Sequence, residues 1–265
     1  MSTFFEKIND LDILLHCDGY EREYFFAECS RLAYKGQKLA SKEFKKVGFT
    51  SYKFCSVEGA QCHIVKNRDY IVIAFRGTEP RQFSDIKADL MAWKRKSRTE
   101  GHVHAGFKNE LDKLWADIKM GLSRKGDRTI YLCGHSLGGA IATVCASRLE
   151  KDVEELYTYG SPRVGGEMFR DNLLVDHCRV VNNNDMVAKV PFWLMGYRHH
   201  GHLTYINHYG NIRELTSWQK LKDQIRGRWC ALRKFQMFDG IRDHDINKYC
   251  SKLKTMVKVE PTFGD

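Results

Sequence analysis

Residues 129–150 read TIYLCGHSLGGAIATVCASRLE, and this stretch decides the fold. Its first part, 129–133, is a short run of apolar and β-forming residues, which predicts a buried strand. Its last part, 138–150, is rich in alanine and predicts a slim helix. The glycines between the two parts let the helix pack close to the strand, so the stretch predicts a strand, a sharp turn and a helix.

The segments on both sides continue this alternation of strand and helix. Short β-rich runs predict further strands, and apolar residues at helical spacing predict further helices. The expected strands are 52–56, 61–66, 70–75, 129–133, 155–159 and 178–182, and the expected helices are 21–35, 104–124 and 138–150. This order predicts an α/β fold with a mostly parallel central sheet covered by helices.

The composition is that of a globular protein with a buried core. The chain has 265 residues, 43% of them hydrophobic, with only 4 prolines and no internal repeat, so we expect one domain over residues 1–265. No run approaches the length of a transmembrane helix. The acidic residues Glu6, Asp10 and Asp12 occupy the start, where a signal peptide needs a basic and then an apolar run, so no cleavable export signal is expected.

Cysteine content and charge indicate a compartment and a class of partner. The 9 cysteines are odd in number and lack metal-binding spacing, which predicts reduced thiols and a cytoplasmic location. The net charge of +10 favours anionic partners, such as phospholipid surfaces or acidic substrates. Nucleic acid is the weakest option, because the basic residues are dispersed and no binding motif is present.

The turn itself carries the strongest chemical signal. Residues 134–138 fit the pattern G-x-S-x-G between a strand and a helix, which presents Ser136 as a nucleophile at the edge of the sheet. The alternative is a purely structural turn. A serine hydroxyl becomes a good nucleophile only when a histidine takes its proton and a carboxylate orients that histidine.

Candidates for the acid and the base follow Ser136 in the sequence. Asp185 comes directly after the strand 178–182, where parallel strands gather functional groups, although it could instead simply form a turn. The residues alone leave the histidine open. The candidates are His199, His200, His202, His208 and His244. Their spacing does not favour a metal site.

The sequence resembles the class 3, or fungal-type, lipases of the α/β-hydrolase superfamily over roughly residues 25–255. The motifs that carry this resemblance are AFRGT at 74–78, HAGF at 104–107, GHSLGG at 134–139, YGSPRVG at 159–165 and RVVN at 179–182, followed by Asp185, Pro191, His199, Gly201, Tyr205, Asp243, His244 and Tyr249. The resemblance implies a triad of Ser136, Asp185 and His244. It assigns His199 to a structural motif at the start of a strand.

An acyl-transfer enzyme also needs hydrogen-bond donors for the oxyanion, each worth about 3 kcal/mol in the transition state. The backbone N–H of Leu137 follows the nucleophile and supplies one donor. The resemblance places the second donor at Thr78, which could otherwise be an ordinary residue at the end of a strand. Arg76 is interpreted as a structural ion-pair partner.

Two amphipathic stretches combine apolar and basic residues. The first predicts a short helix with the apolar residues Phe83, Ile86, Leu90 and Trp93, followed by the basic residues Lys94, Arg95, Lys96 and Arg98. The resemblance makes this helix a lid over the acyl pocket, and a solvated surface helix is the alternative. The second stretch, 218–229, predicts a helix that lies on a membrane surface or is simply solvated.

Together these features predict a lipase or carboxylesterase that cleaves glycerolipid esters through an acyl-enzyme, with no metal or cofactor. Anionic membrane surfaces are an expected peripheral contact. One alternative is a phospholipase A1, which the positive charge favours. An alternative from another class is a catalytically inactive membrane-surface binding protein, but such a protein has no reason to hold Ser136, Asp185 and His244 together.

Overall fold

The computed structural model describes residues 3–8, 11, 19–78, 93–212, 219 and 243–257. Within these residues a seven-stranded sheet has the order β1-β2-β3-β6-β7-β8-β9. Its strands are β1 Ser51–Val57, β2 Ala60–Lys66, β3 Tyr70–Phe75, β6 Thr129–His135, β7 Val153–Tyr159, β8 Asp176–Asn182 and β9 His202–Ile206. Strands β1 to β3 pair antiparallel, whereas β3, β6, β7, β8 and β9 run parallel.

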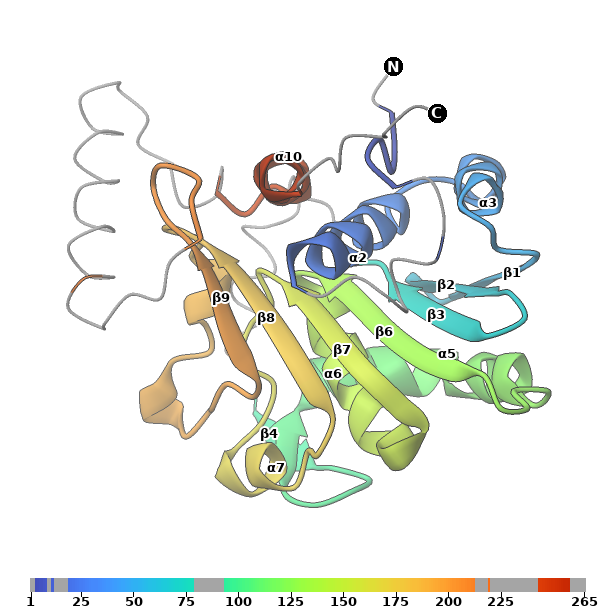
Figure 1. The fold of residues 1–265 in the computed structure, drawn as a ribbon. Helices are drawn as coiled ribbons and strands as arrows, with labels where there is room; N and C mark the ends of the chain where they lie inside the picture. Colours follow the sequence, from blue (N-terminus) through green and yellow to red (C-terminus); the bar gives the residue numbers. More distant parts are fainter. Residues whose placement is uncertain are drawn as a thin grey trace.

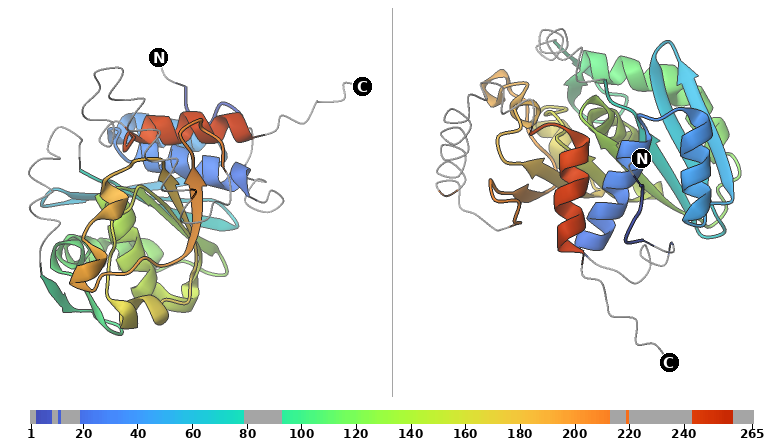
Figure 2. Two further views of the ribbon diagram at one scale, coloured as in Figure 1. Left: turned by 90° about the vertical axis from the view of Figure 1, so that its left-hand side faces the viewer. Right: turned by 90° about the horizontal axis from the view of Figure 1, so that it is seen from above.

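Helices cover both faces of the sheet (Figures 1 and 2). The helices on one face are α2 Tyr20–Leu32, α3 Gln37–Lys46 and α10 Ile246–Met256, and those on the other are α5 Ala105–Leu122, α6 Leu137–Leu149 and the short α7 Glu167–Asp171. Helix α10 lies alongside α2. The connections contain a small hairpin of β4 Lys94–Lys96 and β5 His102–His104, and the 3₁₀ turns η2 Glu150–Asp152, η3 Val187–Lys189 and η4 Trp193–Met195.

The core has two layers, one on each side of the sheet. On the α2 side, Phe26 stacks on Tyr157 with ring centroids 4.2 Å apart. On the α5 and α6 side, Leu111 of α5 packs in the same cluster as Leu132 of β6. Successive residues of β6 point to opposite layers, and both layers are dry. This explains why residues 130–133 form a continuous apolar run instead of alternating with polar residues.

The structure confirms the predicted α/β architecture with its mostly parallel sheet. The expected strands 52–56, 61–66, 70–75, 129–133, 155–159 and 178–182 and the expected helices 21–35, 104–124 and 138–150 are present with small differences at their ends. The helices expected before Trp93 and in 218–229 lie outside the described residues. Helix α3, strand β9 and the hairpin of β4 and β5 were not predicted. Residues Lys94–Lys96 were expected to follow a helix as its basic end, and instead they form a strand that pairs with β5. None of the described helices is long and apolar enough to cross a bilayer.

Replacing Phe26 by alanine tests the layer under α2. The Phe26 side chain is fully buried, so we expect Phe26→Ala to lower the free energy of unfolding by about 3–5 kcal/mol. Urea unfolding followed by circular dichroism measures this loss. The control Met120→Ala removes a side chain that is 61% exposed and should change stability by less than about 0.5 kcal/mol. Equal losses in both variants would contradict the packing.

Candidate active site

Ser136 lies at a strained turn between β6 and α6. Its φ is 59° and its ψ is −130°, a left-handed conformation that is rare for a residue other than glycine. The turn is fixed from behind, because the backbone N–H of Ser136 donates to the carbonyl of Tyr159 at 2.9 Å. Strain of this kind persists only where the surroundings impose it, and it concentrates at functional sites.

Close approach of backbone segments imposes the turn. A Cβ at Gly138 would lie 2.3 Å from the carbonyl oxygen of Phe75, and one at Gly134 would lie 2.4 Å from the backbone of Gly138. Only glycine therefore fits at these two positions. Helix α6 begins at Leu137, directly after the serine, so the first N–H groups of the helix have no partner within the helix. Its positive end favours negative charge beside Ser136.

Asp185 and His244 form a buried hydrogen-bonded pair. The Nδ1 atom of His244 lies 2.8 Å from Oδ2 and 3.0 Å from Oδ1 of Asp185. A carboxylate only accepts, so Nδ1 carries the proton. The carboxylate of Asp185 also accepts from the hydroxyl of Tyr249 at 2.5 Å and from the N–H of Val187 at 2.9 Å. These contacts fix both the carboxylate and the tautomer of the histidine.

The sequence around both residues explains how they meet. Asp185 comes in the turn after β8, at the carboxyl end of that strand. His244 comes just before α10, whose first turn is capped by Asp245 accepting from the N–H of Asn247 at 2.9 Å. The side chain of Asn182 donates to the carbonyl of Asp243 at 2.8 Å. The segment before α10 is thereby fastened to the end of β8.

Gly160 brings this pair to the serine. It follows Tyr159, the residue that holds the backbone of Ser136, and its φ is +55°. A Cβ at Gly160 would lie 2.4 Å from Oδ2 of Asp185 and 2.9 Å from Nδ1 of His244. The nucleophile turn and the Asp185–His244 pair therefore lie against the same two residues of the β7 end, and the structure brings together the three residues predicted from sequence.

His135 packs beneath the pair. Its ring lies 4.4 Å from that of His244, centroid to centroid, and its Nε2 lies 2.6 Å from the carbonyl oxygen of His244. Burial, together with the nearby His244, holds the pKa of His135 well below its ordinary value, so His135 stays neutral. Its Nε2–H therefore donates to His244, and its Nδ1 accepts from the hydroxyl of Tyr34 at 2.8 Å.

The other predicted site residues are only partly described. Thr78 follows β3 and is half-buried, and the preceding Gly77 lies against Ser136, with a built Cβ 3.3 Å from that of the serine. Trp93 is 89% exposed. Phe83, Ile86, Leu90 and the basic stretch 218–229 fall outside the described residues.

The remaining candidate histidines serve other contacts. His199 donates from Nε2 to the carbonyl of Ala188 at 2.8 Å, and His200 lies 3.0 Å from His177 between their Nδ1 atoms. His202 is exposed at the start of β9, and the ring of His208 packs edge-on to Tyr209. In the described part of the chain, no cluster of three His, Cys, Asp or Glu side chains is arranged to hold a metal ion.

Sequence comparison finds similarity to lipases. Residues 72–195 match the family described as lipase (class 3). The chain is 41% identical over 106 residues to secreted mono- and diacylglycerol lipase 1 of Fusarium solani. This alignment covers 37% of this chain and 32% of that protein. It is 31% identical over 149 residues to secreted mono- and diacylglycerol lipase A of Penicillium cyclopium, covering 49% and 45%. The chain thus spans less than half the length of these relatives.

Structure comparison finds the same fold. The Rhizomucor miehei lipase in its propeptide complex matches with a TM-score of 0.60 and 21% identity, covering 70% of this chain and 67% of that one. The lipase of Rhizopus microsporus var. chinensis matches with a TM-score of 0.58 and 24% identity, covering 70% and 74%. These likenesses confirm the predicted α/β-hydrolase fold.

The expected cytoplasmic location is wrong. The Fusarium and Penicillium relatives are both named as secreted lipases. The expectation depended on reduced cysteines, and the described cysteines are indeed free thiols, buried except for Cys178. A buried thiol packs as a small hydrophobic group, so these cysteines reflect core packing and do not identify the compartment.

Tyr249 is expected to stabilise the site through its bond to Asp185. Tyr249→Phe removes one donor from a buried carboxylate, so the free energy of unfolding should fall by about 1.5–3 kcal/mol. The matched control is Tyr209→Phe, where the side chain is 65% exposed and little change is expected. Chemical denaturation measures both. A Tyr249→Phe protein as stable as the parent would show that this hydrogen bond is absent in solution.

Proposed function

We propose that this chain is a class 3 lipase of the α/β-hydrolase superfamily, a serine hydrolase that cleaves carboxylic esters of glycerolipids. The match of residues 72–195 to the lipase (class 3) family and the fold shared with fungal lipases support this proposal. The observation that carries this proposal is the buried hydrogen bond between His244 and Asp185 beside the strained turn of Ser136. The acylglycerol lipases among its relatives support the choice of substrate class. The proposal treats residues 1–265 as one domain, because the described helices pack on a single sheet.

The first step forms an acyl-enzyme. The hydroxyl oxygen of Ser136 attacks the ester carbonyl carbon while Nε2 of His244 takes the hydroxyl proton. Nε2 serves as the base because Nδ1 is committed to Asp185. The carbon–oxygen bond to the glycerol then breaks, and the leaving alcohol receives the proton from His244. The same histidine next takes a proton from water, whose oxygen attacks the acyl carbon. The bond between that carbon and Oγ of Ser136 then breaks, Ser136 takes the proton from His244, and the fatty acid is released.

The oxyanion that forms in both steps needs donors. The backbone N–H of Leu137, at the N-terminus of α6, is the first donor. We assign the second to Thr78, which follows the glycine packed against Ser136. The positive end of α6 adds to both, because it favours the negative charge that develops on the carbonyl oxygen.

The residues around Asp185 and His244 influence how these two side chains are oriented and which charges lie beside them. Asp185 accepts from Tyr249 and from the backbone of Val187 as well as from His244, and these bonds fix the orientation of its carboxylate. His135 touches His244 but is neutral, so it places no competing positive charge beside the histidine that must become protonated during the reaction.

Labelling with a fluorophosphonate tests the nucleophile and the base. The parent enzyme should be labelled stoichiometrically at Ser136, and Ser136→Ala should lose both labelling and roughly 10⁴-fold or more in turnover. His244→Ala should cost a similar factor, because members of a triad act as a unit. The matched control is His202→Ala, which removes an exposed histidine outside the triad and should keep both labelling and turnover.

Three outcomes would contradict this assignment. Labelling that survives Ser136→Ala would show that Ser136 is not the nucleophile. A folded His244→Ala enzyme with parental turnover would place the base elsewhere. Binding to lipid without any ester hydrolysis would favour the inactive binding protein. Parallel assays on triacylglycerol, diacylglycerol and phosphatidylglycerol distinguish an acylglycerol lipase from a phospholipase A1.

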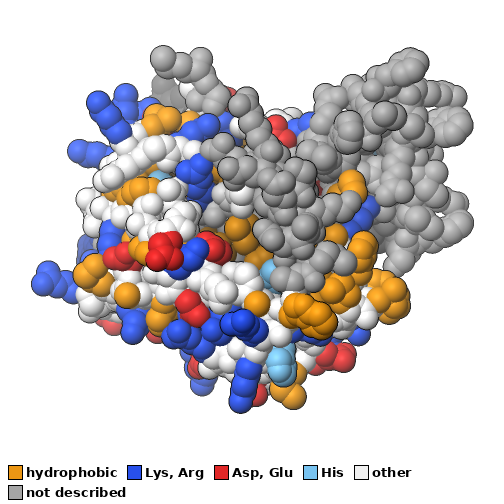
Figure 3. All heavy atoms as spheres, turned by 180° about the vertical axis from the view of Figure 1, so that it is seen from behind, with side chains coloured by type: hydrophobic (Ala, Val, Ile, Leu, Met, Phe, Trp, Pro, Cys, Tyr) orange, Lys and Arg blue, Asp and Glu red, His pale blue; other side chains and the backbone are white. Residues whose placement is uncertain are grey.

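We further propose that the face around β4 contacts anionic lipid. Trp93 is exposed, and Arg95 and Lys96 follow it on the solvent side of the hairpin. The ammonium of Lys94 lies 5.1 Å from the centre of the Tyr197 ring, which joins β4 to a loop with the exposed residues Phe192, Trp193 and Leu194. Figure 3 shows hydrophobic side chains near basic ones on this side of the molecule. Such a surface suits a membrane of negative charge.

Salt should separate surface capture from chemistry. Each cation near an anionic membrane adds about 1 kcal/mol, and the attraction fades beyond about 8 Å at physiological salt. Hydrolysis of lipid in phosphatidylglycerol vesicles should therefore fall steeply as salt rises, whereas hydrolysis of a soluble short-chain ester should barely change. The double variant Arg95→Glu/Lys96→Glu should reproduce the effect of salt on vesicles only.

The matched control reverses two exposed charges elsewhere, Lys119→Glu and Arg124→Glu at the end of α5. The control changes the net charge by the same amount, so an equal loss in both double variants would mean that overall charge, and not the β4 surface, attracts the vesicle. Equal salt sensitivity for both substrates would reject surface capture altogether.

A further inference from the structure

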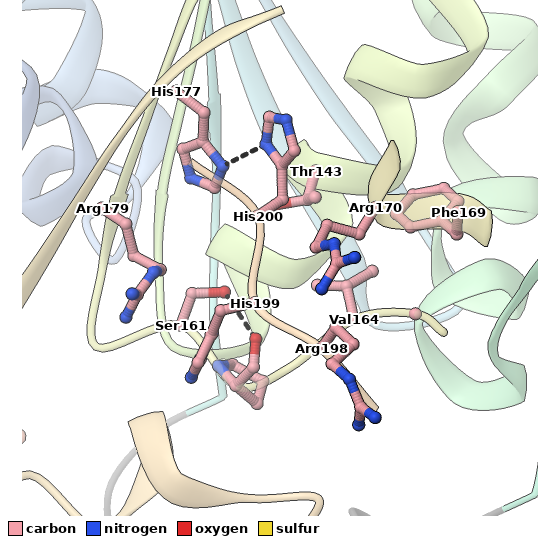
Figure 4. A pocket seen from close by; sticks show the side chains of 12 residues that line it. Thr143, Ser161, Val164, Phe169, Arg170, His177, Arg179, Arg198, His199 and His200 are labelled. Carbon is pink, nitrogen blue, oxygen red and sulfur yellow. Dashed lines mark hydrogen bonds between the residues drawn. The ribbon is translucent and has the colours of Figure 1, made fainter. Parts of the chain in front are cut away.

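A pocket lies on the α6 side of the sheet, where Thr143 of α6 forms part of its lining (Figure 4). Successive side chains of strand β8 point alternately to the two sides of the sheet. Cys178 points toward α2, with its Sγ 3.2 Å from Oε1 of Glu23, so the alternate residues His177 and Arg179 point to the opposite side. The residues that matter for the pocket chemistry are Ser161, Arg170, His177, Arg179, Arg198 and His199.

The lining of this pocket holds three arginines and no carboxylate. Arg170 forms ion pairs outside the pocket with Asp171 at 2.7 Å and Glu167 at 3.1 Å, and these neutralise its charge. Arg198 donates to the carbonyl oxygens of Trp193 at 2.9 Å and Tyr197 at 3.1 Å. Carbonyl groups satisfy the N–H groups of Arg198, but they do not neutralise its charge.

Arg179 is the least compensated of the three. Its Nε is shielded from solvent and has no hydrogen-bond partner among the described residues. Burial, with the charge of Arg163 nearby, lowers the pKa of Arg179 to about 10. That value still lies well above neutral pH, so the guanidinium is charged. Arg179 is half-buried, with a shielded Nε–H that has no acceptor and with no carboxylate beside it, so a pocket that opens onto its guanidinium favours an anion.

The histidines of the pocket add no charge of their own. Burial, together with the arginines around them, holds the pKa of both His177 and His199 well below the ordinary value, so both stay neutral. Their ring nitrogens are also engaged, since His177 lies 2.8 Å from the hydroxyl of Thr158 and 3.0 Å from His200. The positive potential of the pocket therefore comes from arginine.

We propose that this pocket binds one small monovalent anion, such as chloride or bromide, against the guanidinium of Arg179. The pocket has a volume of about 10 Å³, which is room for one small particle. A water molecule would accept from the Nε–H of Arg179 but leave the charge uncompensated, whereas a halide ion would both accept from that N–H and compensate the charge.

The bound anion would also stabilise the loop that follows Asp185. His199 donates to the carbonyl of Ala188, and Arg163 donates to the carbonyls of Lys189 and, at 2.9 Å, Pro191. Arg163 is repelled by Arg198 and His199 lies close to Arg179. An anion that screens this group of cations therefore strengthens the contacts that hold residues 188–191.

Thermal unfolding in sodium bromide tests the site, with sodium gluconate at equal ionic strength as the reference. Bromide at about ten times its dissociation constant should raise the Tm of the parent protein by roughly 3 °C, along a saturable curve. Arg179→Met should abolish this rise. The control Arg128→Met removes an arginine that also donates to backbone carbonyls, far from the pocket, and should keep the rise.

A crystal of the parent protein soaked in bromide gives a second measurement, which does not depend on how well Arg179→Met folds. Anomalous scattering from one bromide ion beside Arg179 supports the site. A pocket with no anomalous peak, or a Tm that rises equally in gluconate, overturns it and leaves the pocket to water. A rise that persists in Arg179→Met also overturns it, because the anion would then bind elsewhere.

Discussion

The left-handed backbone of Ser136 is the constraint on which the rest of the site depends. The turn cannot relax, because β6 ends at His135, α6 begins at Leu137, and the backbone of Gly138 touches the carbonyl of Phe75. A side chain at Gly134 or Gly138 would push the helix away from the sheet. The packing of three backbone segments thus holds the serine in a conformation that an isolated peptide would leave, and the folded core supplies the free energy for this strain.

The acid and the base are positioned by hydrogen bonds between segments that are far apart in the sequence. Asp185 and Tyr249 are 64 residues apart, and Tyr249 lies in α10, which packs along α2 directly after His244. The contact between these helices is not purely apolar, because the thiol of Cys250 hydrogen-bonds to Glu28, which is paired with Arg31. Helix α2 therefore helps to hold α10 and, through it, the segment that carries His244.

The sequence predicts the parts of the site that depend on local structure. Ser136 can be predicted as a nucleophile because a strand, a glycine-rich turn and a helix lie within a few residues of it. Asp185 follows from its place after β8, since the carboxyl ends of parallel strands gather functional groups. The histidine does not follow from local structure, because five candidates lie between 199 and 244 and only contact with Asp185 distinguishes them. The choice of His244 came from the resemblance to a family, and the hydrogen bonds to Asp185 support it.

Other parts of the structure were missed because their signal is tertiary. Strand β9 begins beside a cluster of histidines, and only its last residues are buried, so its pattern is weak. Helix α3 buries few residues. His135 and Tyr249 gain their roles from partners far away in the sequence, Tyr34 and Asp185, which no local pattern connects.

Strand β8 joins the two polar regions of the molecule. Asn182 at its end binds the segment that carries His244, and the loop beyond it carries Asp185. Earlier in the same strand, Arg179 faces the other side of the sheet. The loop after Asp185 is held from that side through the carbonyl oxygens of Ala188, Lys189 and Pro191. The loop that carries Asp185 is thus held from the side of the sheet that Arg179 faces, and the same loop therefore belongs to both polar regions.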